Sequence, residues 1–118
     1  MMIFETMTTA NSFMIELAKY RAQGAHVFTG RDRGAQVRKL SGLDDEELKY
    51  EKVVVVIPRE IYSINPSFFE ELFVNVVKRY GREGFLKRFE FKAEGEYPYE
   101  RPLNEAISRI MRRGSVLG

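Results

Sequence analysis

The stretch that decides the fold is KVVVVIPREIYSINPSFFEELFVNVVKRYG, residues 52–81. It opens with four consecutive valines and an isoleucine, and no polar residue interrupts the run. An apolar run without alternation is typical of a strand that is buried on both faces. Pro58 follows, and proline cannot continue the hydrogen-bond ladder of a central strand. The segment therefore predicts a strand at the centre of a sheet that has helices on both sides.

The second half of the stretch predicts a long helix over residues 63–81. Its apolar residues recur at the spacing of one helical face, and they are Phe69, Leu72, Phe73, Val76 and Tyr80. Ser67 and Glu70 stand three residues apart at its start, which is the spacing of a capping box. Gly81 is expected to end the helix.

Strands and helices alternate outward from this stretch. On the amino-terminal side the pattern predicts a strand (2–7), a helix (11–23), a strand (25–28), a helix (31–40) and an acidic loop or single helical turn (43–51). On the other side it predicts a short turn or helix (82–87), a strand (88–93), a loop (95–102), a helix (103–113) and a flexible tail (114–118). Pro102 suits the first position of the last helix, and Gly114 is expected to end it. This alternation predicts an α/β fold.

Length and composition indicate one globular domain over residues 1–118. The chain of 118 residues is 44% apolar and 31% charged, which lies in the globular range. This composition is also compatible with a homodimer. A net charge of +2 is too small to indicate nucleic-acid binding by itself.

Several classes of protein are excluded by what the sequence lacks. The chain has no cysteine, so disulfides, thiolate catalysis and thiolate metal sites are excluded. Residues 1–9 lack the basic start and long apolar run of a signal peptide. The longest apolar run, residues 53–58, is too short to cross a bilayer. We therefore expect a cytoplasmic protein that does not bind membranes.

The sequence contains no recognisable catalytic or metal-binding motif. His26 is the only histidine, and it lacks the spaced partners of a metal site or a catalytic pair. Glu70 and Glu71 are adjacent, so on a helix their carboxylates point in different directions. We therefore expect no enzyme, no metal and no cofactor. A weaker hypothesis is an enzyme acting on a small phosphorylated ligand beside Arg31 and Arg33, which would require a concave pocket there.

Three stretches carry a resemblance to a known family. They are TGRDRGAQVRKL (29–40), the stretch 52–81 already quoted, and GFLKRFEF (84–91). Between residues 28 and 113 the chain resembles the STAS-like family of unknown function, which is related to sulphate-transporter and anti-sigma-factor-antagonist domains. The resemblance implies one STAS-like sandwich, in which a mixed sheet of about four strands is flanked by about four helices.

The resemblance also implies a protein-binding, regulatory role rather than catalysis. Similar domains bind histidine-kinase-like ATPases in partner-switching regulation, through the start of the central helix. In this sequence that surface corresponds to Ser63, Asn65, Ser67, Phe68 and Glu71. The antagonists carry a phosphorylated serine at this helix start, and the matching positions here are Asn65, Pro66 and Ser67. The position of the phosphorylated serine falls on Pro66, which has no hydroxyl, so the candidate phospho-acceptor is Ser67, one residue on.

The alternative function is that of a small accessory or virus-encoded protein that binds nucleic acid or a nucleic-acid-processing complex. Its candidate contacts are the basic residues of the second predicted helix, Arg31, Arg33, Arg38 and Lys39. A second basic set follows at Lys78, Arg79, Arg82, Lys87 and Arg88. Binding driven by phosphate contacts weakens steeply with salt, whereas an apolar protein interface does so much less.

Overall fold

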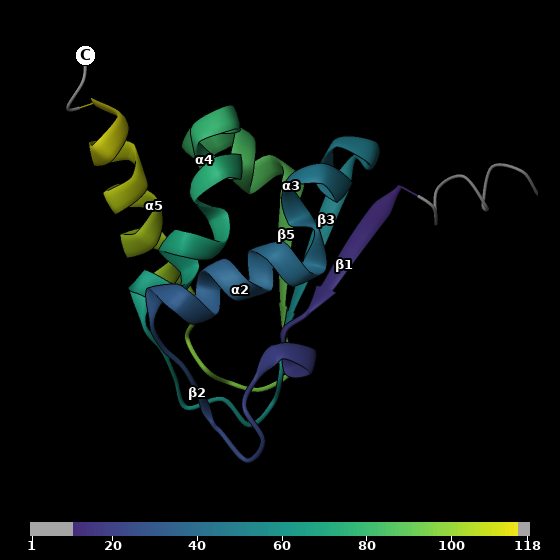
Figure 1. Ribbon diagram of the computed structural model, residues 1–118, viewed down its shortest axis with the longest axis vertical. Coiled ribbons are helices and arrows are strands. Elements are labelled where there is room, and N and C mark those ends of the chain that lie inside the picture. Colours follow the sequence, from purple (N-terminus) through teal and green to yellow (C-terminus); the bar gives the residue numbers. More distant parts are fainter. Residues whose placement is uncertain (1–10, 116–118) are drawn as a thin grey trace, which may run out of the picture.

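The computed structural model describes residues 11–115, and Figure 1 shows their arrangement. The predicted strand over residues 2–7 and the end of the predicted tail lie outside the described residues. The elements in chain order are β1 (Ser12–Glu16), the 3-10 helix η1 (Leu17–Tyr20), β2 (Val27–Phe28), α2 (Arg31–Ser41), α3 (Leu43–Glu46), the 3-10 helix η2 (Glu47–Lys49), β3 (Lys52–Ile57), β4 (Ser63–Ile64), α4 (Pro66–Arg88), β5 (Phe89–Ala93) and α5 (Glu100–Ser115).

The strands form two small parallel sheets rather than one mixed sheet. β3 is the middle strand of the first sheet, between β1 and β5. β2 and β4 pair in the second. The prediction of a mixed sheet of about four strands is therefore wrong, whereas the α/β class is confirmed. Parallel strands need crossover connections, and every pair here has helices in its connection: α2 and α3 lie between β1 and β3 and between β2 and β4, and α4 lies between β3 and β5.

The helices gather on one face of the larger sheet (Figure 1). Val53, Val55 and Ile57 turn to that face and are at most 1% exposed. On the other face Met14 is 51% exposed, and none of the four described α-helices covers it. The prediction of a central strand is confirmed, but the expected second layer of helices is absent from the described part of the chain.

The segment 11–23 is a strand and a 3-10 helix, so the prediction of one helix there is wrong. The apolar residues Phe13, Ile15 and Leu17 stand at every second position, and Ile15 and Leu17 are buried. Ile15 pairs with Val55 of β3 in parallel register. In a strand alternate residues share a face, so Phe13 and Ile15 turn to the same side of β1, where Ile15 is buried.

The remaining predicted helices are confirmed with changed boundaries. α4 contains a break at Gly81, whose φ of 74° is non-helical, so the predicted end of the long helix and the short helix after it are both present. α5 begins at Glu100, which places Pro102 third rather than first in the helix. It also continues through Gly114, which was expected to end it. A glycine near a helix end weakens the helix by only about 1 kcal/mol, so it need not terminate it.

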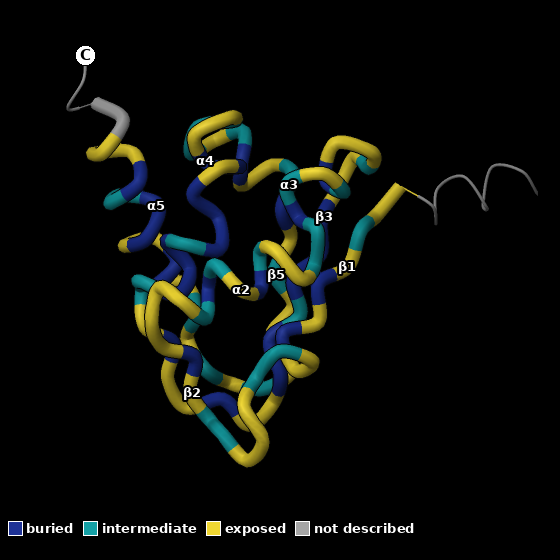
Figure 2. The backbone as a smooth tube through the Cα atoms, in the orientation of Figure 1, coloured by how far each residue is buried: buried dark blue, intermediate teal, exposed yellow. Residues whose placement is uncertain are grey.

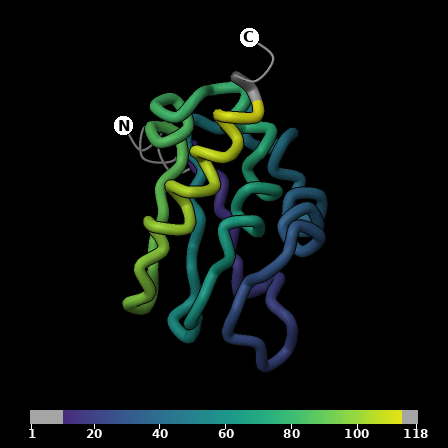
Figure 3. Tube along the Cα trace, turned by 90° about the vertical axis from the view of Figure 1, so that its left-hand side faces the viewer, coloured from purple at the N-terminus to yellow at the C-terminus, as the bar shows by residue number. Residues whose placement is uncertain are grey.

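Aromatic rings fill the core between α4 and the sheet. Phe69 and Phe73 of α4 are at most 1% exposed, and their rings contact Phe91 of β5. Figure 2 shows the buried backbone running through α4 and β3 at the centre of the molecule. Figure 3 shows α5 lying along α4, with α2 on the opposite flank of α4. α4 is therefore the central helix, as predicted.

α2 approaches α4 so closely that Gly34 has no room for a side chain. A Cβ atom on Gly34 would lie 2.3 Å from the carbonyl oxygen of Phe68. Backbone atoms cannot move aside as a flexible side chain can. The close approach fixes the start of α2 against the start of α4.

Gly34→Ala is expected to lower the free energy of unfolding by about 1–3 kcal/mol, because the methyl group forces the two helices apart. At an open helical position the same change would stabilise the protein by about 1 kcal/mol. Denaturant unfolding followed by circular dichroism measures the difference. A stabilised variant would contradict the close approach.

No helix among the described residues is long and apolar enough to cross a membrane.

Candidate functional site

The starts of α2 and α4 lie together because the strands before them are paired. Val27 pairs with Ser63 and Phe28 with Ile64, and the N–H of Asn65 donates to the carbonyl oxygen of Phe28 at 2.9 Å. Both helices then begin within a few residues, α2 after Gly30 and α4 after Asn65. We call this end of the molecule the helix-start surface. It contains the region around the start of the central helix that the sequence predicts.

Asn65, and not Ser67, caps α4. Its Oδ1 accepts hydrogen bonds from the backbone N–H of Ser67 at 2.9 Å and from the Ser67 hydroxyl at 2.8 Å. Asparagine is as good a capping residue as serine, and Pro66 suits the first helical position that follows it. The predicted capping box of Ser67 and Glu70 is therefore wrong, because the helix begins earlier than the box requires.

The predicted partner-binding residues divide into surface and core. Ser63 and Asn65 are exposed, and Ser67 is half-buried with its hydroxyl bound to Asn65. Phe68 is fully buried, and its ring stacks on that of Phe28 at 4.9 Å. Phe68 is thus a core residue, and its prediction as a partner contact is corrected. Its position one turn into α4 points it toward the sheet rather than outward.

Glu71, the last of the predicted partner-binding residues, is held by arginines of α2. Its Oε2 accepts a hydrogen bond from Arg31 Nη1 at 3.2 Å. Its carbonyl oxygen accepts another from Arg38, whose guanidinium also lies 3.8 Å from the Glu71 carboxylate. Two of the four predicted anion contacts, Arg31 and Arg38, are thus engaged in tying α2 to α4.

The buried carboxylate of Glu70 lies close to arginines of both α2 and α5. Glu70 is 3% exposed, and its carboxylate lies 3.4 Å from Arg31, 3.0 Å from Arg113 and 3.7 Å from Arg109. The hydrogen bond and charge of Glu70 are the main causes that raise the pKa of Arg31. The α5 arginines were not predicted as part of a site, because the only local signal was the favourable place of Arg113 near a helix end.

This cluster borders a shallow depression of about 540 Å³ that Arg112 also lines. Four arginines and one carboxylate line it, and three of these arginines pair with Glu70. The arrangement joins three helices electrostatically, and we assign it a structural role.

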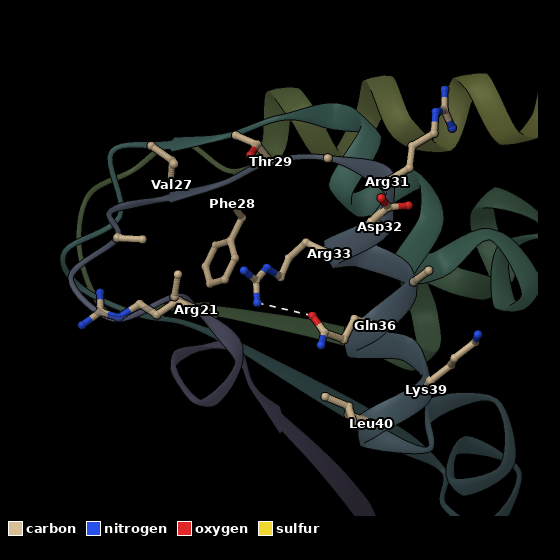
Figure 4. Close-up of a pocket in the computed structure, with 14 residues that line it drawn as sticks. Arg21, Val27, Phe28, Thr29, Arg31, Asp32, Arg33, Gln36, Lys39 and Leu40 are labelled. Carbon is tan, nitrogen blue, oxygen red and sulfur yellow. Dashed lines mark hydrogen bonds between the residues drawn. The ribbon is translucent and has the colours of Figure 1, made fainter.

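A larger cavity of about 1100 Å³ lies beside the start of α2 (Figure 4). Figure 4 shows Arg33, Gln36 and Leu40 turned toward it from one face of α2. The opposite wall comes from β2 and the loop before it, with Arg21, Val27 and Phe28. The concave pocket that the phosphorylated-ligand hypothesis requires is therefore present.

Arg33 and Lys39, the other two predicted anion contacts, both line this cavity. Arg33 Nη1 donates to the Tyr20 carbonyl oxygen and to Gln36 Oε1, each at 3.3 Å. Both acceptors are neutral. Within residues 11–115 neither Arg33 nor Lys39 forms an ion pair with a carboxylate.

The basic residues of the second predicted set are also largely engaged. Arg79 and Arg88 both bind the buried carboxylate of Glu47, and Arg82 donates to the hydroxyl of Ser108 at 2.8 Å. Lys78 and Lys87 are exposed. The two basic sets therefore do not present a continuous row of unpaired arginines.

An aromatic pair, the exposed Tyr62 and the half-buried His26, lies just before the paired strands β4 and β2 that lead into the helix starts. The Tyr62 ring stacks on His26 with centroids 4.8 Å apart, and Tyr62 is 71% exposed. The Tyr62 N–H donates to the His26 carbonyl oxygen at 2.7 Å, and His26 Nδ1 donates to that of Glu60 at 2.9 Å. Val27 beside them is 42% exposed. His26 was expected in a strand, and no sequence pattern pointed to Tyr62.

Among the described residues no group of three or more His, Asp or Glu side chains could hold a metal ion. His26 donates to a backbone carbonyl and stacks on a tyrosine, so no carboxylate orients it as in a catalytic pair.

Comparisons of the chain with protein-family models, with curated proteins and with solved structures found no match in any of the three.

Proposed function

We propose that this chain is a non-catalytic protein-interaction module that docks a protein partner on its helix-start surface. The observation that carries the proposal is the exposed, preorganised ring of Tyr62, which is the most exposed of the large hydrophobic side chains within residues 11–115. Buried tyrosines dominate the binding energy of many protein interfaces. Together with Val27, which is 42% exposed, the ring forms an exposed apolar patch of the kind that marks interaction sites.

The local structure supports this role because it holds the ring before a partner arrives. Stacking on His26 and the backbone hydrogen bond between the two residues restrict the Tyr62 ring. Binding then costs less conformational entropy than it would for a freely rotating side chain. Val27 extends the apolar surface, and Ser63 and Asn65 supply polar groups at its edge.

The partner class that fits the STAS-like resemblance is a histidine-kinase-like ATPase. Ser67 remains the proposed phospho-acceptor, because it lies in the first turn of α4, where a negative group is favoured. Phosphorylation would remove its present hydrogen bond to Asn65 and add charge next to the proposed interface.

Tyr62→Ala is expected to weaken partner binding by about tenfold or more, because it removes the central aromatic contact. The experiment begins with capture of the partner from the native host by the tagged chain, with and without nuclease. The partner is then identified by mass spectrometry and purified. Its affinity for the wild-type and variant chains is measured by calorimetry at two salt concentrations.

The matched control is Leu48→Ala, which removes an apolar side chain that is 61% exposed on η2, away from the helix starts. It should leave the affinity unchanged. Equal loss in both variants, or no purified protein that binds the chain, would contradict the proposal. Recovery that disappears with nuclease and at moderate salt would favour the nucleic-acid alternative instead.

A further inference from the structure

We infer that the cavity beside the start of α2 binds a small molecule that carries a phosphate group on an apolar body. This binding site shares Val27 with the proposed docking surface but does not include Tyr62, and it does not depend on the protein-interaction role. It rests on three features of the cavity: its size, the basic side chains in it that pair with no carboxylate, and the exposed apolar side chains beside them.

The size of the cavity suits a small organic ligand. Its volume of about 1100 Å³ lies at the upper end of the range for small-molecule sites. The depression beside Glu70 is about half as large, and three of the four arginines that line it are already paired with Glu70.

Two basic residues that line the cavity, Arg33 and Lys39, pair with no carboxylate within residues 11–115, although Asp32 also lines it. Arg33 reaches into the cavity, and its guanidinium donates only to a backbone carbonyl and an amide oxygen. On the facing wall, Nη2 of Arg21 pairs with Glu60 at 3.4 Å, and only its Nη1 is buried without a hydrogen-bond partner within the described part of the chain. A guanidinium with unused donors binds phosphate through charge-assisted hydrogen bonds. These donors therefore point to an anionic ligand group.

The rest of the lining is suited to an apolar body. Val27 and Leu40 are 42% and 66% exposed, and both line the cavity. Gln36 lies between Arg33 and Leu40 on the same face of α2 and offers its amide to polar groups of a ligand. A ligand with phosphate at Arg33 and an apolar part against Leu40 would contact both kinds of side chain. Inorganic phosphate would contact only the charged one.

Phenyl phosphate is the probe that tests this assignment. Titrated into the ¹⁵N-labelled full chain, it is expected to produce saturable shifts in the amide signals of residues 25–40, with a higher affinity than inorganic phosphate. Arg33→Gln should weaken its binding by about tenfold or more, because one charged hydrogen-bonding group is lost. Gln36→Glu should also weaken binding, because it places a negative charge beside Arg33 without changing a buried residue.

Lys78→Gln is the matched control, because it also removes one positive charge but lies on α4 and does not line the cavity. Its affinity for phenyl phosphate should equal that of the wild type. Absence of saturable shifts in the wild-type chain would overturn the inference. An equal loss in Arg33→Gln and Lys78→Gln would also overturn it, because the effect would then come from net charge alone. An affinity for inorganic phosphate as high as that for phenyl phosphate would overturn the apolar half of the assignment.

Discussion

Replacing Phe73 by alanine is expected to lower the free energy of unfolding by about 3–5 kcal/mol. Phe73 is 1% exposed, and its ring lies 5.1–5.8 Å from the rings of Phe69, Phe85, Phe89 and Phe91. These neighbours come from both segments of α4 and from β5. A cavity at this point therefore removes contacts that join the central helix to the sheet. Denaturant unfolding followed by circular dichroism measures the loss.

Phe13→Ala is the control for Phe73→Ala, because it deletes the same side chain at the margin of the core. Phe13 is only partly buried, and its ring stacks on that of Tyr50 at 5.7 Å. Phe13→Ala should lower the free energy of unfolding by clearly less than Phe73→Ala does. Equal losses would show that the aromatic cluster is not the centre of the core.

The central strand and central helix could be predicted because each carries its own complete pattern. The valine run of β3 is buried in almost any α/β arrangement, and Gly81 marks the break in α4 by a backbone conformation that glycine readily adopts. Neither prediction depends on which strand or helix packs against β3 or α4. Parallel pairing, in contrast, is decided by contacts between residues far apart in the chain.

The amino-terminal segment was mispredicted because it satisfies two patterns at once. Phe13, Leu17 and Tyr20 have helical spacing, whereas Phe13, Ile15 and Leu17 have strand spacing. Both sets share residues, so periodicity alone cannot choose between them. The choice is made by the edge of β3, which offers β1 a ladder of hydrogen bonds.

The candidate site was only partly predictable for a related reason. The basic residues at the start of α2 could be named, but not which of them would be neutralised. Arg31 is paired with Glu70 and Arg33 is not, although they stand two residues apart. Glu70 is joined to Arg113 across 43 positions, which no local pattern encodes. The sequence around Asn65 is enough to predict a helix cap there, but the spacing of Ser67 and Glu70 predicts a different cap two residues later.

Arg88→Met is expected to lower the free energy of unfolding by about 2–3 kcal/mol, because it leaves a buried carboxylate with one cation fewer. Glu47 is fully buried, and its carboxylate binds Arg79, Arg88 and the hydroxyl of Tyr80. Burial, followed by the hydrogen bond and charge of Glu47, raises the pKa of Tyr80, so that its hydroxyl remains a donor. Arg88 also donates to the Tyr50 carbonyl oxygen at 2.9 Å. Because Arg88 is 25% exposed, solvent screening keeps the expected loss below that of a fully buried pair.

A double-mutant cycle with Glu47→Gln separates the charge effect from lost packing. If the loss in Arg88→Met comes from the unbalanced carboxylate, neutralising Glu47 in the same chain should recover about 1 kcal/mol or more relative to additive behaviour. Lys49→Met is the surface control, because the ion pair of Lys49 with Glu46 is exposed and should contribute less than about 0.5 kcal/mol. If the effects of the two substitutions are simply additive, the loss of stability in Arg88→Met comes from packing and from the Tyr50 hydrogen bond. The buried charge would then have no role in holding η2 against α4.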